Sequence, residues 1–122
     1  MAYADCFVLP VPVKKLAAYK ALAKKVSKIW MEHGALEYRE CGGEDLGIAK
    51  QMKCVPFMKM AKAKASETVF VSWIIYKNRA HRDRVNAKIM ADPRMAAMCD
   101  MKNLPFDVKR MACGGFSVLV EG

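Results

Sequence analysis

The chain has 122 residues, of which 54% are hydrophobic. This suits one compact domain spanning residues 1–122. No apolar run reaches the length of a membrane-spanning helix, which argues against an integral membrane protein. Lysine and arginine total 21 against 12 acidic residues, and a net charge of +9 favours anionic partners such as nucleic acid or small anions.

The first half of the chain predicts a strand, a long helix and a second strand. Residues 3–9 alternate so that both faces of a strand carry apolar side chains, and the prolines that follow are expected to end it. From Val13 to His33, apolar residues recur at three- and four-residue steps, which is typical of an amphipathic helix. Gly34 is placed to cap it. Residues 35–41 predict a short edge strand with polar residues on both faces.

The second half predicts strand, helix and strand. Residues 68–76 are dense in Val, Ile, Phe, Trp and Tyr, and both faces are largely apolar, which indicates a central strand. Asn78 is expected to cap a helix, and Asp92-Pro93 to start another short helix. Residues 110–121 predict a last strand, with a bulge at Gly114-Gly115.

The order strand, helix, strand, strand, helix, strand predicts an α+β, ferredoxin-like βαββαβ fold with a four-stranded antiparallel sheet. Its first and third strands would occupy the middle. Two helices cover only one face of such a sheet, yet both faces of the central strands are apolar. We therefore expect a second copy on the open face, giving an isologous homodimer and a dimeric α+β barrel.

Four segments resemble the YbaA-like family of bacterial proteins. They are MAYADCFVLPVPVKKLAAYKALAKK, IWMEHGALEYRE, SWIIYKNRAHRDRVNAKIMADPRM and LPFDVKRMACGGFSVLV. The resemblance implies a small cytoplasmic protein of the dimeric α+β barrel superfamily, which includes cofactor-independent monooxygenases, EthD-type proteins and stress-responsive barrels. It implies no particular reaction and no catalytic residue.

A first candidate site lies where the central strand runs into the next helix. His81 could act as acid or base near neutral pH, and Arg82 could stabilise an anionic or enolate oxygen. Trp73, Tyr76 and Asn86 would complete a small-molecule pocket with apolar walls and a few polar groups. The alternative is that His81 and Arg82 open a surface helix or pair with a carboxylate across the dimer.

A second candidate group surrounds the end of the first helix, where Trp30, His33 and Glu37 could contact a ligand. The alternative is a helix-end histidine that interacts favourably with the helix dipole. Asp5 and Asp83 are isolated, and we expect both to be structural. Two distant histidines and five cysteines without a CxxC pair predict no metal site, and the absence of a Gly-rich phosphate loop predicts no cofactor.

Lysines cluster on the first helix and in a Met- and Lys-rich stretch between residues 44 and 67, where we expect a loop with a short helical piece. Lysines that contact phosphates give salt-sensitive affinity for RNA. The candidate RNA contacts are Lys20, Lys24, Lys28, Lys50, Lys53, Lys59 and Lys62. The alternative is a solvated surface that keeps the protein soluble.

Three functions remain open. The leading hypothesis is a homodimeric barrel that holds a small apolar or anionic ligand between sheet and helices, either as a cofactor-independent oxygenase-type enzyme or as a binding protein. The second is a basic RNA-binding module, and the third is a non-enzymatic stress-response or structural dimer. The absence of a signal peptide pattern and the unpaired cysteines predict a cytoplasmic location.

Overall fold

The computed structural model describes residues 1–98 and 103–122. As predicted, it has an α+β architecture with one four-stranded antiparallel sheet. The strands are β1 (Tyr3–Pro12), β2 (Glu37–Gly42), β3 (Glu67–Tyr76) and β4 (Ala112–Ser117). Their order across the sheet is β2-β3-β1-β4, so β1 and β3 occupy the middle.

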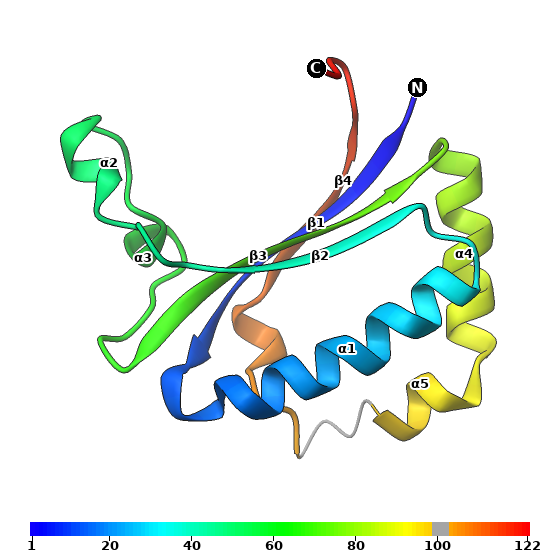
Figure 1. The fold of residues 1–122 in the computed structure, drawn as a ribbon, viewed down its shortest axis with the longest axis horizontal. Helices are drawn as coiled ribbons and strands as arrows, with labels where there is room; N and C mark the ends of the chain where they lie inside the picture. Colours follow the sequence, from blue (N-terminus) through cyan, green and yellow to red (C-terminus); the bar gives the residue numbers. More distant parts are fainter. Residues whose placement is uncertain (99–102) are drawn as a thin grey trace.

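Helices cover one side of this sheet, and an arm extends from one end of it (Figure 1). The covering helices are α1 (Leu16–Glu32), preceded by a 3-10 turn at Val13–Lys15, then α4 (Arg79–Ala91) and α5 (Pro93–Met98). The arm, residues 43–66, connects β2 to β3 and carries two one-turn helices, α2 (Ile48–Gln51) and α3 (Phe57–Met60). A 3-10 turn at Val108–Arg110 precedes β4. No helix in the described part of the chain is long and apolar enough to cross a membrane.

Local signals in the sequence account for the helix ends. The Asn78 side chain accepts a hydrogen bond from the His81 N–H at 2.8 Å, which confirms Asn78 as an N-cap. Asp92 accepts from the Arg94 N–H at 2.9 Å, where α5 begins with a proline. Gly34 follows α1 with φ of 109°, a left-handed conformation that favours glycine.

The core lies between the sheet and the helices. Alternation along β1 and β3 turns one set of side chains toward α1 and α4, and these form two buried clusters. The first cluster includes Tyr3, Ile29, Ile74, Tyr76, Val85 and Ile89. The second contains Leu9, Val11, Tyr19 and Phe70. The opposite set of β3 side chains, which includes Trp73, is largely half-buried and faces away from these helices.

The prediction that prolines end the first strand was wrong, because β1 continues through Pro10 to Pro12. The Val13 N–H donates to the Ser66 carbonyl at 2.9 Å, on the β3 side. N–H groups alternate between the two sides of a strand, so those of residues 10 and 12 would point away from β3. Pairing with β4 has already ended there, at Val8. The prolines therefore remove no hydrogen bond from the sheet.

The predicted bulge in the last strand was also wrong, because residues 112–117 pair one-to-one with residues 3–8. Gly115 instead leaves room for a large side chain. A Cβ atom at this position would overlap the Tyr3 hydroxyl and lie 2.8 Å from Tyr3 Cζ. This glycine lets the Tyr3 ring lie against β4.

Candidate functional site

A buried aspartate lies in the middle of the sheet, on its helix-covered side. Asp5 stands on the central strand β1, between Ile74 of β3 and Gly115 of β4, and is only 8% exposed. Burial raises the pKa of its carboxyl above the ordinary value of 3.8, against the opposing effects of Arg82 and of hydrogen bonds from Tyr76 and Asn86. The fold thus holds a carboxylate with increased proton affinity among polar partners.

A chain of hydrogen bonds from Trp30 through Tyr76 to Asn86 runs beside this carboxylate. Trp30 Nε1 donates to the Tyr76 hydroxyl at 3.0 Å, and the Tyr76 and Asn86 side chains lie close enough to Asp5 to oppose the rise in its pKa. Tyr76 Oη also lies 3.5 Å from Asn86 Oδ1. A hydroxyl has one proton, and in this geometry Tyr76 donates it to the Asn86 side-chain oxygen. Burial raises the pKa of Tyr76 to about 12, and its hydroxyl therefore stays protonated at neutral pH.

Arg82 lies beside Asp5 but forms no short ion pair with it. Its Nη1 atom is 3.5 Å from Asp5 Oδ1, and Nη2 donates to the Tyr3 hydroxyl at 3.2 Å. The guanidinium lies over the Tyr3 ring, 4.9 Å from its centroid. Nε lies 3.1 Å from Asp83 Oδ1, yet it is buried and makes no well-aligned hydrogen bond to any described residue. The guanidinium therefore keeps unused donor capacity close to the carboxylate.

These groups border a cavity of about 340 Å³, which we call the Asp5 cavity. Its polar lining comes from Asp5, Arg82 and Asn86, and Trp30 forms part of its apolar wall. Phe7, Ile89, Met90 and the β4 residues Cys113, Gly114 and Gly115 complete the lining. A carboxylate, a guanidinium and an amide around an apolar space can bind a small molecule, and the carboxylate can accept a proton from it.

Four of the candidate residues from the sequence meet here, although they were assigned to two separate groups. Tyr76, Arg82, Asn86 and Trp30 all surround Asp5. His81 does not line the Asp5 cavity. Its Nδ1 accepts from the Lys77 N–H at 3.0 Å, and its ring packs edge-on against Tyr76 at 5.9 Å. Burial and nearby basic side chains lower the pKa of His81, which favours a neutral imidazole at pH 7.

The remaining candidates lie elsewhere. His33 Nε2 is 2.8 Å from Asp92 Oδ2, a contact that joins the end of α1 to the start of α5. Trp73 points to the opposite face of the sheet and donates to Glu37 Oε2 at 2.7 Å. The structure therefore places Glu37 with Trp73 on the other face of the sheet, away from Trp30, and it separates Trp73 from Tyr76.

Sequence reasoning missed Asp5 as a site residue. The available signal was an acidic residue inside an apolar strand that was itself expected to be central. A carboxylate buried there needs partners, and it is rarely kept without them. Among residues 1–98 and 103–122, no group of three or more His, Cys, Asp and Glu residues could hold a metal ion. Cys6, Cys41, Cys54 and Cys113 are free thiols, and Cys99 lies outside the described residues.

Comparison with known proteins places the chain in a family. A family model described as "Protein of unknown function (DUF1428)" matches residues 2–108. The protein YbaA of Escherichia coli K12 is 39% identical over 121 residues, which cover 99% of each chain. YbaA of Shigella flexneri is similar to the same extent. The chain therefore belongs to the DUF1428 family and is a YbaA-like protein.

Proposed function

We propose that this protein binds a small, largely apolar molecule in the Asp5 cavity and that Asp5 takes up an acidic proton from the bound molecule. The observation that carries the proposal is the carboxylate itself, buried on a central strand, bordering a cavity and held only loosely by Arg82. A raised pKa makes this carboxylate a stronger base than an exposed aspartate. Perturbed carboxylates of this kind cluster at functional sites.

The neighbours of Asp5 fit distinct roles. An acidic C–H or O–H proton of the substrate passes to an Asp5 carboxylate oxygen, and the electron pair left behind moves onto the substrate oxygen as an enolate or phenolate. Arg82 lies close enough to stabilise that oxyanion. Tyr76 and Asn86 hold the carboxylate in place, and Trp30 adds an apolar wall. His81 is not required in this scheme.

An enolate or phenolate beside apolar walls is also the species that a cofactor-independent oxygenase presents to O₂. Oxygenation, with O₂ as the oxidant of the bound anion, is the extension of this chemistry that we favour. It needs a base, an oxyanion partner and apolar walls, and the Asp5 cavity offers all three.

We further propose a ferredoxin-like subunit that forms a homodimeric α+β barrel through the uncovered face of the sheet. The strand order β2-β3-β1-β4 supports the first part. The second rests on half-buried apolar residues of the uncovered face: Cys6, Val8, Val71, Trp73 and Ile75. Phe116 of β4 lies on the same face and is 57% exposed. Light scattering after size exclusion should give twice the mass of one chain, and a monomer would contradict the barrel.

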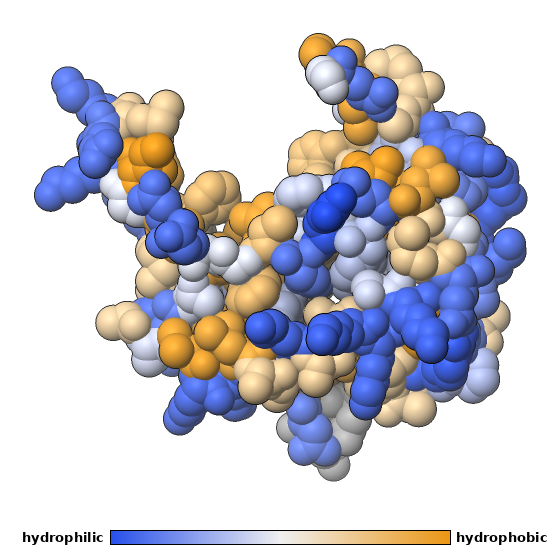
Figure 2. Space-filling model, viewed as in Figure 1, coloured by the Kyte–Doolittle hydropathy of each residue, from blue (hydrophilic) through white to orange (hydrophobic). Residues whose placement is uncertain are grey.

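RNA binding is the second candidate function, and the arm supports it. Figure 2 shows hydrophilic surface along α1 and over the arm, next to apolar residues. All seven candidate lysines are exposed: Lys20, Lys24, Lys28, Lys50, Lys53, Lys59 and Lys62. Phe57 on the arm is 42% exposed and could stack on a base. The test is whether the protein retains bulk RNA at low salt. If it retains none, these lysines are solvated surface residues, as in a purely structural or stress-response dimer.

Proton abstraction at Asp5 can be tested without knowing the natural substrate. A ketone of suitable size, 2-tetralone, exchanges its acidic C–H protons for deuterium in D₂O, and NMR measures the rate. We expect the protein to accelerate this exchange. The acceleration by Asp5→Asn should be smaller than that by the original protein by a factor of about ten or more. Asp45→Asn removes an exposed carboxylate on the arm, and it should accelerate the exchange of 2-tetralone as much as the original protein does.

Equal rates for the original protein and Asp5→Asn would remove Asp5 as the base. Native mass spectrometry of protein taken directly from cells gives an independent test of the cavity. A mass that is lost on mild denaturation, and that Asp5→Asn no longer retains, would support ligand binding there. A retained mass that Asp5→Asn keeps unchanged would assign the ligand to another part of the protein.

A further inference from the structure

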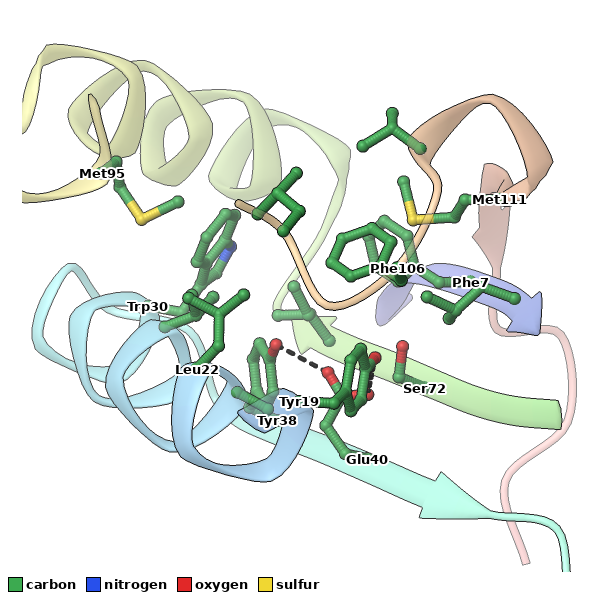
Figure 3. Close-up of a pocket in the computed structure, with 16 residues that line it drawn as sticks. Phe7, Tyr19, Leu22, Trp30, Tyr38, Glu40, Ser72, Met95, Phe106 and Met111 are labelled. Carbon is green, nitrogen blue, oxygen red and sulfur yellow. Dashed lines mark hydrogen bonds between the residues drawn. The ribbon is translucent and has the colours of Figure 1, made fainter. Parts of the chain in front are cut away.

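A second cavity lies on the same side of the sheet, nearer to β2. It occupies about 280 Å³ between the sheet, α1, α5 and residues 104–111, and Figure 3 draws its 16 lining residues. Phe7 and Trp30 border both this cavity and the Asp5 cavity. Its lining is almost entirely aromatic and aliphatic, with one carboxylate, Glu40. We call it the Glu40 cavity.

The Glu40 carboxylate is held by two tyrosines from different elements. Tyr19 of α1 donates to Oε1 at 2.8 Å, and Tyr38 of β2 donates to Oε2 at 2.9 Å. Figure 3 shows the two rings on either side of the carboxylate. Burial, reinforced by Glu40, raises the pKa of both tyrosines far above the usual value, so both remain donors.

Glu40 has acceptor capacity that its neighbours do not fill. A carboxylate offers about four acceptor positions, and the two tyrosines occupy one on each oxygen. Within the described residues, no lysine, arginine or histidine forms an ion pair with Glu40. Glu40 also lines a neighbouring groove between α1 and β2 together with Lys20 and Lys24, but neither lysine lines the cavity. A charge beside apolar walls is stabilised by any further donor that reaches it.

We infer that the Glu40 cavity is a second ligand site, which takes a small apolar molecule whose single hydrogen-bond donor, a hydroxyl or an ammonium group, bonds to Glu40. The volume lies at the lower end of ligand pockets and suits one ring or a short chain. Tyr19, Tyr38, Trp30 and Phe106 supply faces that can pack on the ligand body or beside an ammonium group. An anionic ligand is repelled by Glu40, in contrast to the Asp5 cavity with its arginine.

Three probes of nearly the same shape test this specificity: 2-phenylethanol, 2-phenylethylammonium and 3-phenylpropanoate. Calorimetric titration should show binding of at least one donor probe, with the propanoate at least about tenfold weaker. The stronger of the alcohol and the ammonium identifies the donor. Glu40→Gln should weaken the favoured probe about tenfold, because it replaces a charge-assisted hydrogen bond with a neutral one. Glu44→Gln, an exposed carboxylate on the arm, should bind like the original protein.

The two tryptophans of the chain show on which face of the sheet the probe binds, and because Trp30 borders both cavities, the Glu40→Gln variant is needed to assign the probe to the Glu40 cavity. Trp30 lines the Glu40 cavity, whereas Trp73 lies on the other face of the sheet. The indole N–H signal of Trp30 should shift on titration while that of Trp73 stays in place. In folded Glu40→Gln the same shift should require about tenfold more probe. Failure of both donor probes to bind, equal binding of the propanoate, or unchanged affinity in folded Glu40→Gln would each overturn the inference. Because Glu40 does not line the Asp5 cavity, none of these results depends on proton transfer at Asp5.

Discussion

Two carboxylate–arginine pairs in this molecule are similarly shielded from solvent, yet they differ in geometry. Glu67 at the start of β3 is 7% exposed, and Asp5 in the middle of β1 is 8% exposed. Arg110 donates two hydrogen bonds of 2.7 and 2.8 Å to the Glu67 carboxylate, and the Lys64 N–H donates a third of 2.7 Å. Arg82 approaches Asp5 through one contact of 3.5 Å.

The pKa values move in opposite directions, because desolvation dominates at Asp5, deeper in the protein, and hydrogen bonding dominates at Glu67. The hydrogen bonds from Arg110 and Lys64 lower the pKa of Glu67 to about 2, more than offsetting its burial. Burial in the middle of the sheet raises the pKa of Asp5, because its partners compensate the charge only in part. The Glu67 carboxylate, ion-paired on both oxygens, contributes to the fold, whereas the Asp5 carboxylate, with one long contact to its arginine, can accept a proton more readily.

The largest effect is expected from Glu67→Gln. This change leaves the Arg110 guanidinium without its counter-charge and weakens three short hydrogen bonds, so we expect a loss of about 2 to 3 kcal/mol in the free energy of unfolding. Because the folded pKa of Glu67 is lowered, its stabilisation is complete above pH 4.5 and disappears as the pH falls toward about 2. Urea unfolding at neutral and acidic pH measures both quantities.

Glu44→Gln is the matched control, since Glu44 is an exposed residue of the arm. It should unfold at the urea concentration of the original protein at every pH. If Glu67→Gln were no less stable than this control, the Glu67–Arg110 pair would not stabilise the fold. The proposed difference in role between Glu67 and Asp5 would then be wrong.

A smaller effect is expected from Gly115→Ala, which acts on the loosely held pair. The new methyl group would overlap the Tyr3 hydroxyl and displace the ring beneath the Arg82 guanidinium. We expect a loss of about 1 to 3 kcal/mol from overpacking, together with slower proton exchange because Arg82 shifts. Gly47→Ala is the control, because a Cβ there meets no atom within 4 Å and φ is −71°. Equal stability of the two variants would show that the Tyr3 ring can yield to the methyl group without cost, and equal proton exchange would show that Tyr3 does not hold Arg82 in place.

Much of the fold could be predicted because the determining signals are local. Periodicity located the long helix and the two central strands, and Asn78, Asp92 and Gly34 marked helix ends at single positions. The continuation of β1 through its prolines could not be predicted in this way. It depends on where β4 stops pairing, which is a property of a strand about 100 residues later in the chain.

The site was predicted in part for a similar reason. Tyr76 ends β3, and Arg82 and Asn86 lie one turn apart in the helix α4 that follows, so their proximity follows from the local sequence. Asp5 reaches them only through the register that places it opposite Ile74, and sequence patterns do not specify register when both faces of a strand are apolar. His81 precedes Arg82 by one position, but about 100° of helical rotation turns it away from the cavity.

The smallest change in stability, and the sharpest contrast with Glu67, is expected from Asp5→Asn. Because the folded pKa of Asp5 is raised above its ordinary value of 3.8, the folded protein binds this proton more tightly than the unfolded chain. Ionised Asp5 therefore reduces stability, increasingly as the pH rises from 3.8 through the folded pKa. Asparagine has the same shape without the charge, so the variant should be as stable as the original protein or slightly more stable at pH 7. The two should converge below pH 3.8, where both side chains are neutral. Urea unfolding at both pH values measures this, and the same samples should have lost proton exchange on 2-tetralone. A loss of stability like that of Glu67→Gln would instead make Asp5 and Arg82 a second structural ion pair, and proton transfer would need another base.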